Sequence, residues 1–500
     1  MIQQLTPTII LGVIIAYFLL LIAISYFTGK DANNEQFFLA GRKSPWFVVA
    51  FGMIGASLSG VTFISVPGTV GAGGANQAFS YMQVVFGYLL GYAVIALVLM
   101  PLYYRLKLTS IYTYLEQRFG WSAYKTGAGY FLLSRVLGAS LRLYLVAIVL
   151  HGFVLGPMGI PFWLTVAATI ILIWVYTFRG GINTIIWTDT LQTACMLIAV
   201  VTTIFAIGSA LETDIGGLVD YIKNSEYSKV FFFEGGWSDP NNFFKQFISG
   251  ALITIVMTGL DQDMMQKNLS CRNLRDAQKN MFTFSGVLVI ANVLFLSLGA
   301  LLYIYAANVG LTLPDRSDQL YPMIALQHLS PVIGIIFILG LIAAAYSSAD
   351  SALTALTTSF CVDFLDFEKK DVPQESQKAT RFKVHIGFSI LLFLVILIFN
   401  LINSRAVIDM VLKVAGYTYG PILGLFAFGM LTKLKVNNTW VIPICVAAPI
   451  LTFVLDYFSA EIFYGFQFGF LNLAVNGLLT FVGLLTISYH APAKPEEEQH

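Results

Sequence analysis

Long apolar segments recur along almost the whole chain and are separated by short polar connections. A helix rises 1.5 Å per residue, so about 20 apolar residues cross the roughly 30 Å hydrocarbon core of a bilayer. The pattern therefore predicts an all-α integral membrane protein with about 13 transmembrane helices. The predicted spans are residues 7–28, 45–71, 78–103, 122–150, 160–177, 184–210, 243–264, 280–307, 330–362, 381–402, 406–431, 438–456 and 466–488.

The polar connections differ in their content of Lys and Arg. Every second connection, together with its adjoining positions and the C-terminal tail, carries twenty basic residues in all, whereas the remaining connections carry four. Cytoplasmic loops of membrane proteins are enriched in Lys and Arg. We therefore expect a plasma membrane protein (in a bacterium, of the inner membrane) with its N-terminus outside and its C-terminus in the cytoplasm. The basic connections are 29–44, 104–121, 178–183, 265–279, 363–380 and 432–437.

Composition agrees with a lipid-embedded chain and excludes several functions. Hydrophobic residues make up 57% of the 500 residues and charged residues 11%, against about 25% charged in soluble domains. A net charge of +1 gives no basic surface for nucleic acid. The four cysteines and five histidines do not cluster, and there is no nucleophile–base pair or phosphate-binding loop. We expect no enzyme and no obligatory protein partner, but a protein that meets the lipid bilayer and a small molecule.

The second predicted span has a centre of glycines and hydroxyl residues, Gly52-Met-Ile-Gly55-Ala-Ser57-Leu58-Ser59-Gly60-Val-Thr62, followed by Pro67. Small residues are compatible with close helix packing. Glycines with hydroxyls and a downstream proline also favour local unwinding. Unwound carbonyls at membrane depth are tolerated beside protein or a wet cavity, where they can coordinate a cation.

The ninth predicted span carries a matching set of hydroxyls around Ser347, Ser348 and Ser351, with Asp350 between them. Hydroxyl and carbonyl oxygens suit a hard cation such as sodium, although serines also serve as ordinary contacts between helices. A carboxylate in the bilayer is costly unless it is paired or hydrated. Asp350 and Asp189, which lies about two turns into the sixth span, are therefore functional candidates, with a structural, hydrogen-bonded role as the alternative.

Several short motifs occur together in a specific order along most of the chain. They are Phe37-Phe-Leu-Ala-Gly-Arg42, Tyr114-Leu-Glu-Gln-Arg-Phe-Gly120, the Tyr176-Thr…Gly180-Gly…Thr188-Asp189…Gln192 pattern, Gln262 with Gln266, and Gly420-Pro-Ile-Leu-Gly424. In this combination the chain resembles the sodium/solute symporter family, and its pocket pattern is most similar to that of the bacterial sialic acid symporters.

The resemblance implies a LeuT-type fold with two inverted repeats of five helices. It places the first repeat at residues 45–210 and the second at 243–431. An extra helix and an inner loop precede them (1–44), an extracellular loop joins them (211–242), and two C-terminal helices with a short cytoplasmic tail follow (432–500).

The resemblance also implies a sodium site between the first helix of repeat one and the third helix of repeat two. Gly55, Leu58 and Ala344 would supply carbonyls, and Ser347 and Ser348 would supply hydroxyls. Asp189 matches an acid that helps to hold a second sodium ion in some members. Asp350 has no counterpart in that pattern and is expected to be a charge partner or an added coupling site.

The substrate pocket that the resemblance implies contains Ser57, Ser59, Thr62, Phe79 and Gln83. In the sialic acid symporters an arginine of the third core helix clamps a carboxylate, and guanidinium suits this bidentate contact. Here that position holds Gly138, while Arg135 and Arg142 stand three residues before it and four after it on the same helix face. Either arginine could reach the solute or could pair with a buried acid.

We expect a sodium-coupled symporter that imports a small organic solute by alternating access, with a carboxylate-bearing sugar such as sialic acid as one solute class. Neutral sugars, inositol and amino acids are alternatives, although Met257 and Thr254 stand where sugar transporters carry an aromatic and an amide. A proton-coupled carrier that uses Asp189 or Asp350 is the other alternative.

Overall fold

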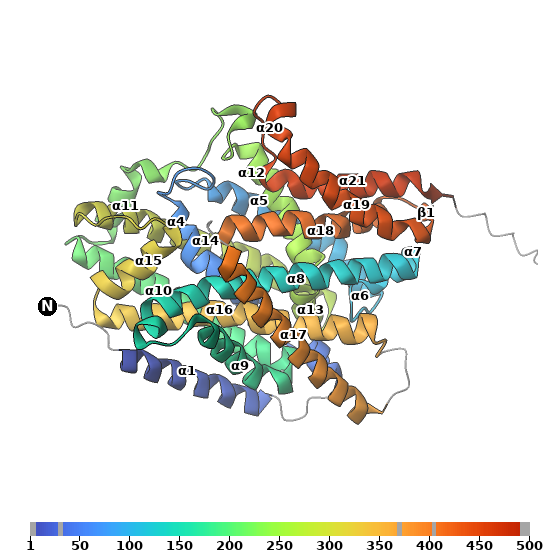
Figure 1. Cartoon of the computed structure of the whole chain (residues 1–500), viewed down its shortest axis with the longest axis horizontal. Helices are drawn as coiled ribbons and strands as arrows, with labels where there is room; N and C mark the ends of the chain where they lie inside the picture. The colour runs from blue at the N-terminus through green and yellow to red at the C-terminus, as the bar shows by residue number, and fades with distance from the viewer. Residues whose placement is uncertain (1–6, 29–33, 368–372, 403–406, 491–500) are drawn as a thin grey trace, which may run out of the picture.

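The computed structural model describes residues 7–28, 34–367, 373–402 and 407–490, and these residues are mostly helical (Figure 1). One short antiparallel pair, β1 (Lys435–Val436) with β2 (Ser488–Tyr489), is the sheet of this part of the chain. Parts of the predicted basic loops and the predicted C-terminal tail lie outside the described residues.

The described residues up to Ala210 contain ten α-helices. They are α1 (Pro7–Thr28), α2 (Asn34–Leu39), α3 (Trp46–Ser57), α4 (Val66–Thr69), α5 (Tyr81–Val94), α6 (Met100–Arg105), α7 (Thr113–Phe119), α8 (Trp121–Leu150), α9 (Phe162–Gly180) and α10 (Ile182–Ala210).

The second half contains α11 (Ile215–Lys223), α12 (Phe243–Thr254), α13 (Gln262–Leu269), α14 (Leu274–Asn308), α15 (Leu320–Met323), α16 (Pro331–Ser359), α17 (Gln374–Ile402), α18 (Val407–Leu431), α19 (Asn438–Tyr457), α20 (Ser459–Ile462) and α21 (Asn472–Thr486). Single π-helical turns extend several of these helices, at Val61–Ser65, Ile95–Leu99, His151–Leu155, Ile255–Gly259, Ile324–His328 and Phe360–Phe364.

The membrane-spanning segments follow the predicted order. Ten helices of the described chain are long and apolar enough to cross a bilayer, and two bent helix pairs raise this number to 12. The remaining predicted span, 160–177, corresponds to α9, whose apolar stretch Phe162–Thr177 is shorter. A predicted thirteen-helix protein is therefore consistent with the structure by length and composition.

Two of the spans are broken in the middle. In the first, α3 ends where Leu58 leaves helical geometry (φ −81°, ψ 70°), and the chain turns by 61° into Val61–Thr69. The glycine- and serine-rich centre predicted this break. In the second, Phe243–Gly259 and α13 meet at 63°, and the Asp261 side chain caps α13 by accepting hydrogen bonds from the backbone of Asp263 and Met264. The apolar pattern of residues 243–264 predicts one continuous span, so the break at this position is a correction.

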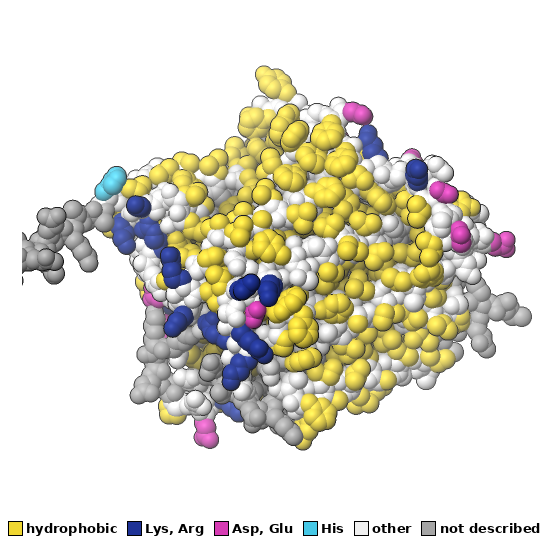
Figure 2. Space-filling model, turned by 180° about the vertical axis from the view of Figure 1, so that it is seen from behind, with side chains coloured by type: hydrophobic (Ala, Val, Ile, Leu, Met, Phe, Trp, Pro, Cys, Tyr) yellow, Lys and Arg dark blue, Asp and Glu magenta, His cyan; other side chains and the backbone are white. Residues whose placement is uncertain are grey.

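The broken spans lie beside the central helices of the bundle. Helix α10 packs against α3 and α16, and α8 packs against α16 and α18. Helices α1, α9 and α17 cover one edge, and α19 and α21 cover another (Figure 1). Apolar side chains spread over the surface in Figure 2, whereas Lys and Arg gather toward one end. The polar interior is therefore enclosed by apolar helices.

Two glutamines of the sequence motifs, Gln262 and Gln266, bind the inner connections to the helix bundle. The Gln262 side chain accepts a hydrogen bond from the backbone of Ile111 (3.0 Å) and donates to the carbonyl of Thr109 (2.7 Å). Gln266 donates to the carbonyl of Phe38 (2.5 Å). These contacts tie α13 to both of the first two predicted inner loops, so the short helix after the second break is fixed in place.

Candidate functional site

The end of α3 lies in close contact with α10 and α16. A Cβ added at Gly55 would come within 2.3 Å of Thr193 Oγ1, 3.2 Å of Ser347 Oγ and 3.3 Å of the carbonyl oxygen of Asp189. A larger residue would separate the three helices. Glycine at this position therefore lets the carbonyls at the end of α3 approach the hydroxyls of α16.

The hydroxyls of α16 differ in their partners. Ser347 donates a hydrogen bond to Asp189 Oδ1 (2.7 Å). Ser348 Oγ is buried and has no hydrogen-bond partner among the described residues. Leu58 and Ala344 are also buried, each 1% exposed. A buried hydroxyl without a partner costs free energy, about 1–3 kcal/mol, and a cation coordinated by Ser348 would remove this cost. The oxygen set is of the kind that sodium accepts.

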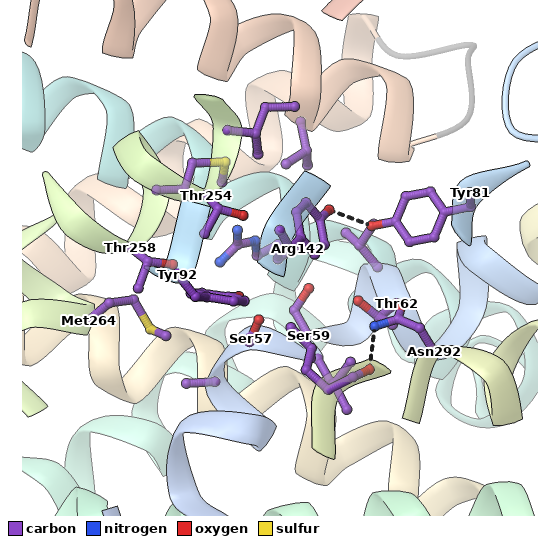
Figure 3. Close-up of a pocket in the computed structure, with 18 of the residues that line it drawn as sticks. Ser57, Ser59, Thr62, Tyr81, Tyr92, Arg142, Thr254, Thr258, Met264 and Asn292 are labelled. Carbon is purple, nitrogen blue, oxygen red and sulfur yellow. Dashed lines mark hydrogen bonds between the residues drawn. The ribbon is translucent and has the colours of Figure 1, made fainter. Parts of the chain in front are cut away.

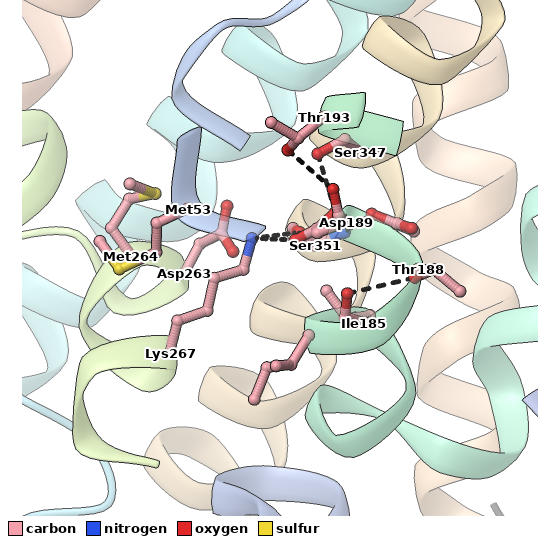
Figure 4. Close-up of polar contacts among 12 residues, drawn as sticks. Met53, Ile185, Thr188, Asp189, Thr193, Asp263, Met264, Lys267, Ser347 and Ser351 are labelled. Carbon is pink, nitrogen blue, oxygen red and sulfur yellow. Dashed lines mark hydrogen bonds and ion pairs between the residues drawn. The ribbon is translucent and has the colours of Figure 1, made fainter. Parts of the chain in front are cut away.

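Asp189 meets a buried lysine that the sequence analysis assigned to a loop. Lys267 Nζ of α13 lies 2.6 Å from Asp189 Oδ2 and donates to Ser351 Oγ at 2.7 Å (Figure 4). The Lys267 side chain is 1% exposed and that of Asp189 is fully buried. Lys267 is therefore not a basic loop residue that reports on topology, but part of the polar interior.

Asp350 is held from the opposite side by the Tyr176 motif. The Tyr176 hydroxyl donates to Asp350 Oδ2 (2.8 Å), and the backbone amide of Ser351 donates to Asp350 Oδ1 (2.5 Å). The next motif residue, Thr177, lies 3.2 Å from a ring nitrogen of His385. Asp350 is thus a hydrogen-bonded acid that links α9 to α16, next to the Lys267 contact.

A cavity of about 100 Å³ opens beside the break in the first span (Figure 3). It brings together five residues that the sequence analysis assigned to the substrate: Ser57, Ser59, Thr62, Arg135 and Arg142. A Cβ at Gly60 would lie 3.7 Å from the carbonyl oxygen of Arg142, so α8 passes directly over the break. Additional polar lining comes from Tyr81, Tyr88, Tyr92, Thr254, Thr258 and Asn292.

The two arginines of α8 have different surroundings. Arg135 forms ion pairs with Asp261 (3.7 Å) and, in closer contact, with Asp263. Arg142 forms no ion pair within the described part of the chain, and its buried Nε has no hydrogen-bond partner there. Its guanidinium faces the centre of the cavity in Figure 3. Arg142 therefore lines the cavity without an ion-pair partner among the described residues.

The structure does not bring Phe79 and Gln83 to this cavity. The Gln83 amide donates to the carbonyl of Asn241 (2.8 Å) and to Gln246 Oε1 (2.9 Å), and it accepts from the backbone of Phe232 (3.0 Å). The face of α5 that carries tyrosines lines the cavity instead. The i, i+7 and i+11 spacing of Tyr81, Tyr88 and Tyr92 was the available signal for that face.

The comparisons with known proteins agree with this architecture. The model of the sodium:solute symporter family matches residues 37–439. The sodium/sialic acid symporter NanT of Aliivibrio fischeri is 24% identical over 91% of this chain and 89% of its own. The corresponding protein SiaT of Proteus mirabilis is 25% identical over 94% and 92%. A solved Na+-coupled sialic acid symporter, in a substrate-bound outward-open state, superposes with a TM-score of 0.80 at 21% identity, covering 96% of this chain and 97% of that one.

The fold with its two broken helices and polar centre defines a multi-pass membrane transporter of LeuT-type architecture, as expected. The chain belongs to the sodium:solute symporter family. It is accordingly a transporter and not an enzyme, and it couples the movement of a small solute to sodium.

Proposed function

We propose that this symporter imports an anionic organic solute whose carboxylate is bound by Arg142. The observation that carries this proposal is a guanidinium in the cavity that forms no ion pair with an acid of the described chain, with Nε left without a partner. A buried cation without an ion pair is costly, and a carboxylate would form a charge-assisted, bidentate contact with it. The serine and threonine hydroxyls of the break can then accept and donate hydrogen bonds to the hydroxyl groups of a sugar acid.

Sialic acid is the solute class we favour. It combines one carboxylate with many hydroxyls, and the similar proteins NanT and SiaT are described as sialic acid symporters. Ser57, Ser59 and Thr62 offer hydroxyls in the same cavity as Arg142, and the tyrosines of α5 add apolar ring faces and hydroxyls to its lining. Phe79 and Gln83 would contact the solute in a conformation in which the Asn241 connection has released Gln83.

The coupling sodium ion is proposed to lie where α3 ends against α16. Gly55, Leu58 and Ala344 would provide carbonyl oxygens, and Ser347 and Ser348 would provide hydroxyls. The tight contact at Gly55 and the unpartnered Ser348 Oγ support this position. Asp189 accepts the hydrogen bond of Ser347 and so orients the Ser347 oxygen toward the same region.

Sodium at this position would couple the two bundles mechanically. The proposed inverted repeats, 45–210 and 243–431, each begin with a broken span, and the nearly equal bends of 61° and 63° support the assignment. The ion would join the first helix of one repeat to the third helix of the other and would order the break beside the solute. Inward rocking would separate Ser348 from Leu58 and release both cargoes.

The gathering of Lys and Arg at one end of the molecule (Figure 2) supports an inner-membrane orientation with that end in the cytoplasm and the N-terminus outside. We propose that the lipid bilayer surrounds the protein and that the chain transports its solute without an obligatory second protein.

Ligand-dependent thermal unfolding of the purified protein tests this proposal. A panel of sialic acids, neutral sugars, inositols and amino acids is measured with sodium and with choline in its place. We expect stabilisation by a sialic acid that depends on sodium, and none by the same sugar acid after esterification of its carboxylate. Sodium-dependent stabilisation by a neutral sugar or an inositol, but by no carboxylate, would overturn the assignment of Arg142.

A further inference from the structure

A lysine ammonium fills an oxygen site at membrane depth. Lys267 Nζ is bound by Asp189 Oδ2 at 2.6 Å and by Ser351 Oγ at 2.7 Å, and both partners are fully buried (Figure 4). Ser351 Oγ also lies 3.5 Å from Asp189 Oδ2, so these oxygens surround one position. A carboxylate with neighbouring hydroxyls is an oxygen set that also suits a hard metal cation.

The lysine reaches this position from a helix that is held in place. Lys267 lies on α13, where the carbonyl of Lys267 accepts a hydrogen bond from Ser270 Oγ (2.6 Å) and the neighbouring Gln266 is bonded to Phe38. Its ammonium crosses to Asp189 of α10 and Ser351 of α16. The positive charge is therefore supplied by the protein itself, at a point where a transporter with a shorter side chain would have room for an ion.

The formal charges of the cluster indicate how many further cations it accepts. In their ionised forms Asp189 and Asp350 carry two negative charges, joined through Ser351, and Lys267 carries one positive charge. One negative charge remains, and Asp189 also accepts the hydrogen bond of Ser347, which belongs to the proposed sodium site. One sodium ion beside Ser347 neutralises the cluster. A second ion would leave an excess positive charge in an apolar interior, which is costly.

We propose that the Lys267 ammonium is a built-in cation that replaces a second sodium ion at Asp189, Ser347 and Ser351, so that one sodium ion accompanies each solute. This inference rests on the proposed sodium site next to Ser348, and it adds the number of sodium ions that accompany each solute. Asp189 then acts as the counter-ion of Lys267 and as the positioning residue of Ser347, not as a ligand of a transported ion.

The test counts sodium ions on the purified full-length protein in lipid nanodiscs, with sodium alone as the probe. Equilibrium binding of radioactive sodium gives the number of ions per protein. The sodium dependence of thermal unfolding provides an independent count, because its slope against the logarithm of concentration scales with the number of ions bound. We expect about one ion in the native protein and about two in Lys267→Ala, which frees the oxygen site, with the unfolding slope roughly doubled.

A second variant separates the ammonium from the packing of the side chain. Lys267→Met keeps most of the apolar stem but ends before the position of Nζ, so we expect it to bind about two ions as well. It keeps the proposal testable if Lys267→Ala does not fold, because one ion on folded Lys267→Met would contradict it. Two ions on the native protein, or one ion on folded Lys267→Ala, would also overturn it. Absence of sodium binding from the native protein would instead remove the proposed sodium site itself.

Discussion

Arg135 of α8 forms a buried ion pair with Asp263, the second residue of α13, across the break in the second broken span. Asp261, which caps α13, lies 3.7 Å from the same guanidinium and accepts a hydrogen bond from the Tyr419 hydroxyl. Arg135 thereby contacts both acids that the break introduces. This arrangement separates the surroundings of the two α8 arginines, since Arg135 pairs with the acids of the break, whereas we propose that Arg142 binds the solute.

We expect Arg142→Gln to abolish high-affinity binding of the solute while leaving sodium binding intact. Hydrogen bonds to charged groups contribute about 1.5–3 kcal/mol, so the dissociation constant should rise roughly 10- to 100-fold. Arg142→Lys should recover part of this loss, because an ammonium keeps the charge but not the bidentate geometry. Calorimetric titration with a sialic acid measures the effect. Unchanged affinity in Arg142→Gln would show that the carboxylate is bound elsewhere.

Arg135→Met should lower the stability of the fold. It leaves Asp261 and Asp263 buried without a cation, and breaking such a pair costs about 3–5 kcal/mol. Lys229→Met is the control, because the Lys229–Glu234 pair is exposed (47% and 86%) and should contribute less than about 1 kcal/mol. Thermal unfolding in detergent compares the two variants. Equal midpoints for both would mean that Arg135 does not stabilise the break.

The order of the apolar spans and the first break could be predicted from sequence because apolar length and a run of glycines and serines are local signals. The second break could not be recognised in the same way. Its sequence, Thr258-Gly-Leu-Asp261, follows a regular apolar segment, and the signal was a single aspartate that caps the next helix. The inverted symmetry of the predicted repeats was the other available indication.

The side-chain partners inside the bundle depend on packing that hydropathy does not encode. Lys267 counts as one more positive loop residue in a sequence, whereas the structure shows it buried against Asp189. The same holds for α5, where the choice between the Gln83 face and the Tyr88 face follows from the neighbours of the helix. The first break, in contrast, follows from the composition of its segment, and the family resemblance implies the pocket positions of Ser57, Ser59 and Thr62, which line the cavity.

Ser348→Ala should weaken sodium activation of uptake. The substitution removes an oxygen that has no hydrogen-bond partner in the described structure, so a coordinating role is the property that is lost. Loss of one ligand, at about 1.4 kcal/mol, corresponds to a roughly tenfold higher half-activating sodium concentration. The control is Ser389→Ala, whose hydroxyl bonds to the carbonyl of His385. A sodium curve identical to that of the native protein would remove Ser348 from the site.

Gly55→Ala should impair both packing and sodium affinity. The new methyl group would overlap Thr193 Oγ1 and press on Ser347 Oγ, and overpacking of this kind costs about 1–3 kcal/mol. Gly129→Ala on α8 is the matched control, since a Cβ there meets no atom within 4 Å. Sodium-dependent thermal unfolding distinguishes them: Gly55→Ala should lose sodium stabilisation and Gly129→Ala should keep it. If sodium still stabilised both variants, the ion would have to bind away from Gly55.

The charge moved in each transport cycle links the assignments of Arg142 and Lys267. One sodium ion with a monoanionic solute carries no net charge, so accumulation in proteoliposomes should not respond to an imposed membrane potential. In Lys267→Ala, a second sodium ion would make each cycle carry one positive charge inward. A potential of about 100 mV, negative inside, then contributes about 2.3 kcal/mol and up to roughly 50-fold further accumulation.

Potassium diffusion potentials set with valinomycin, at constant sodium gradient, measure the accumulation of solute by the native protein and by Lys267→Ala. Potential-driven accumulation by the native protein would mean either a neutral solute or a second sodium ion, and counting the bound ions in the same preparation shows which of the two assignments has failed.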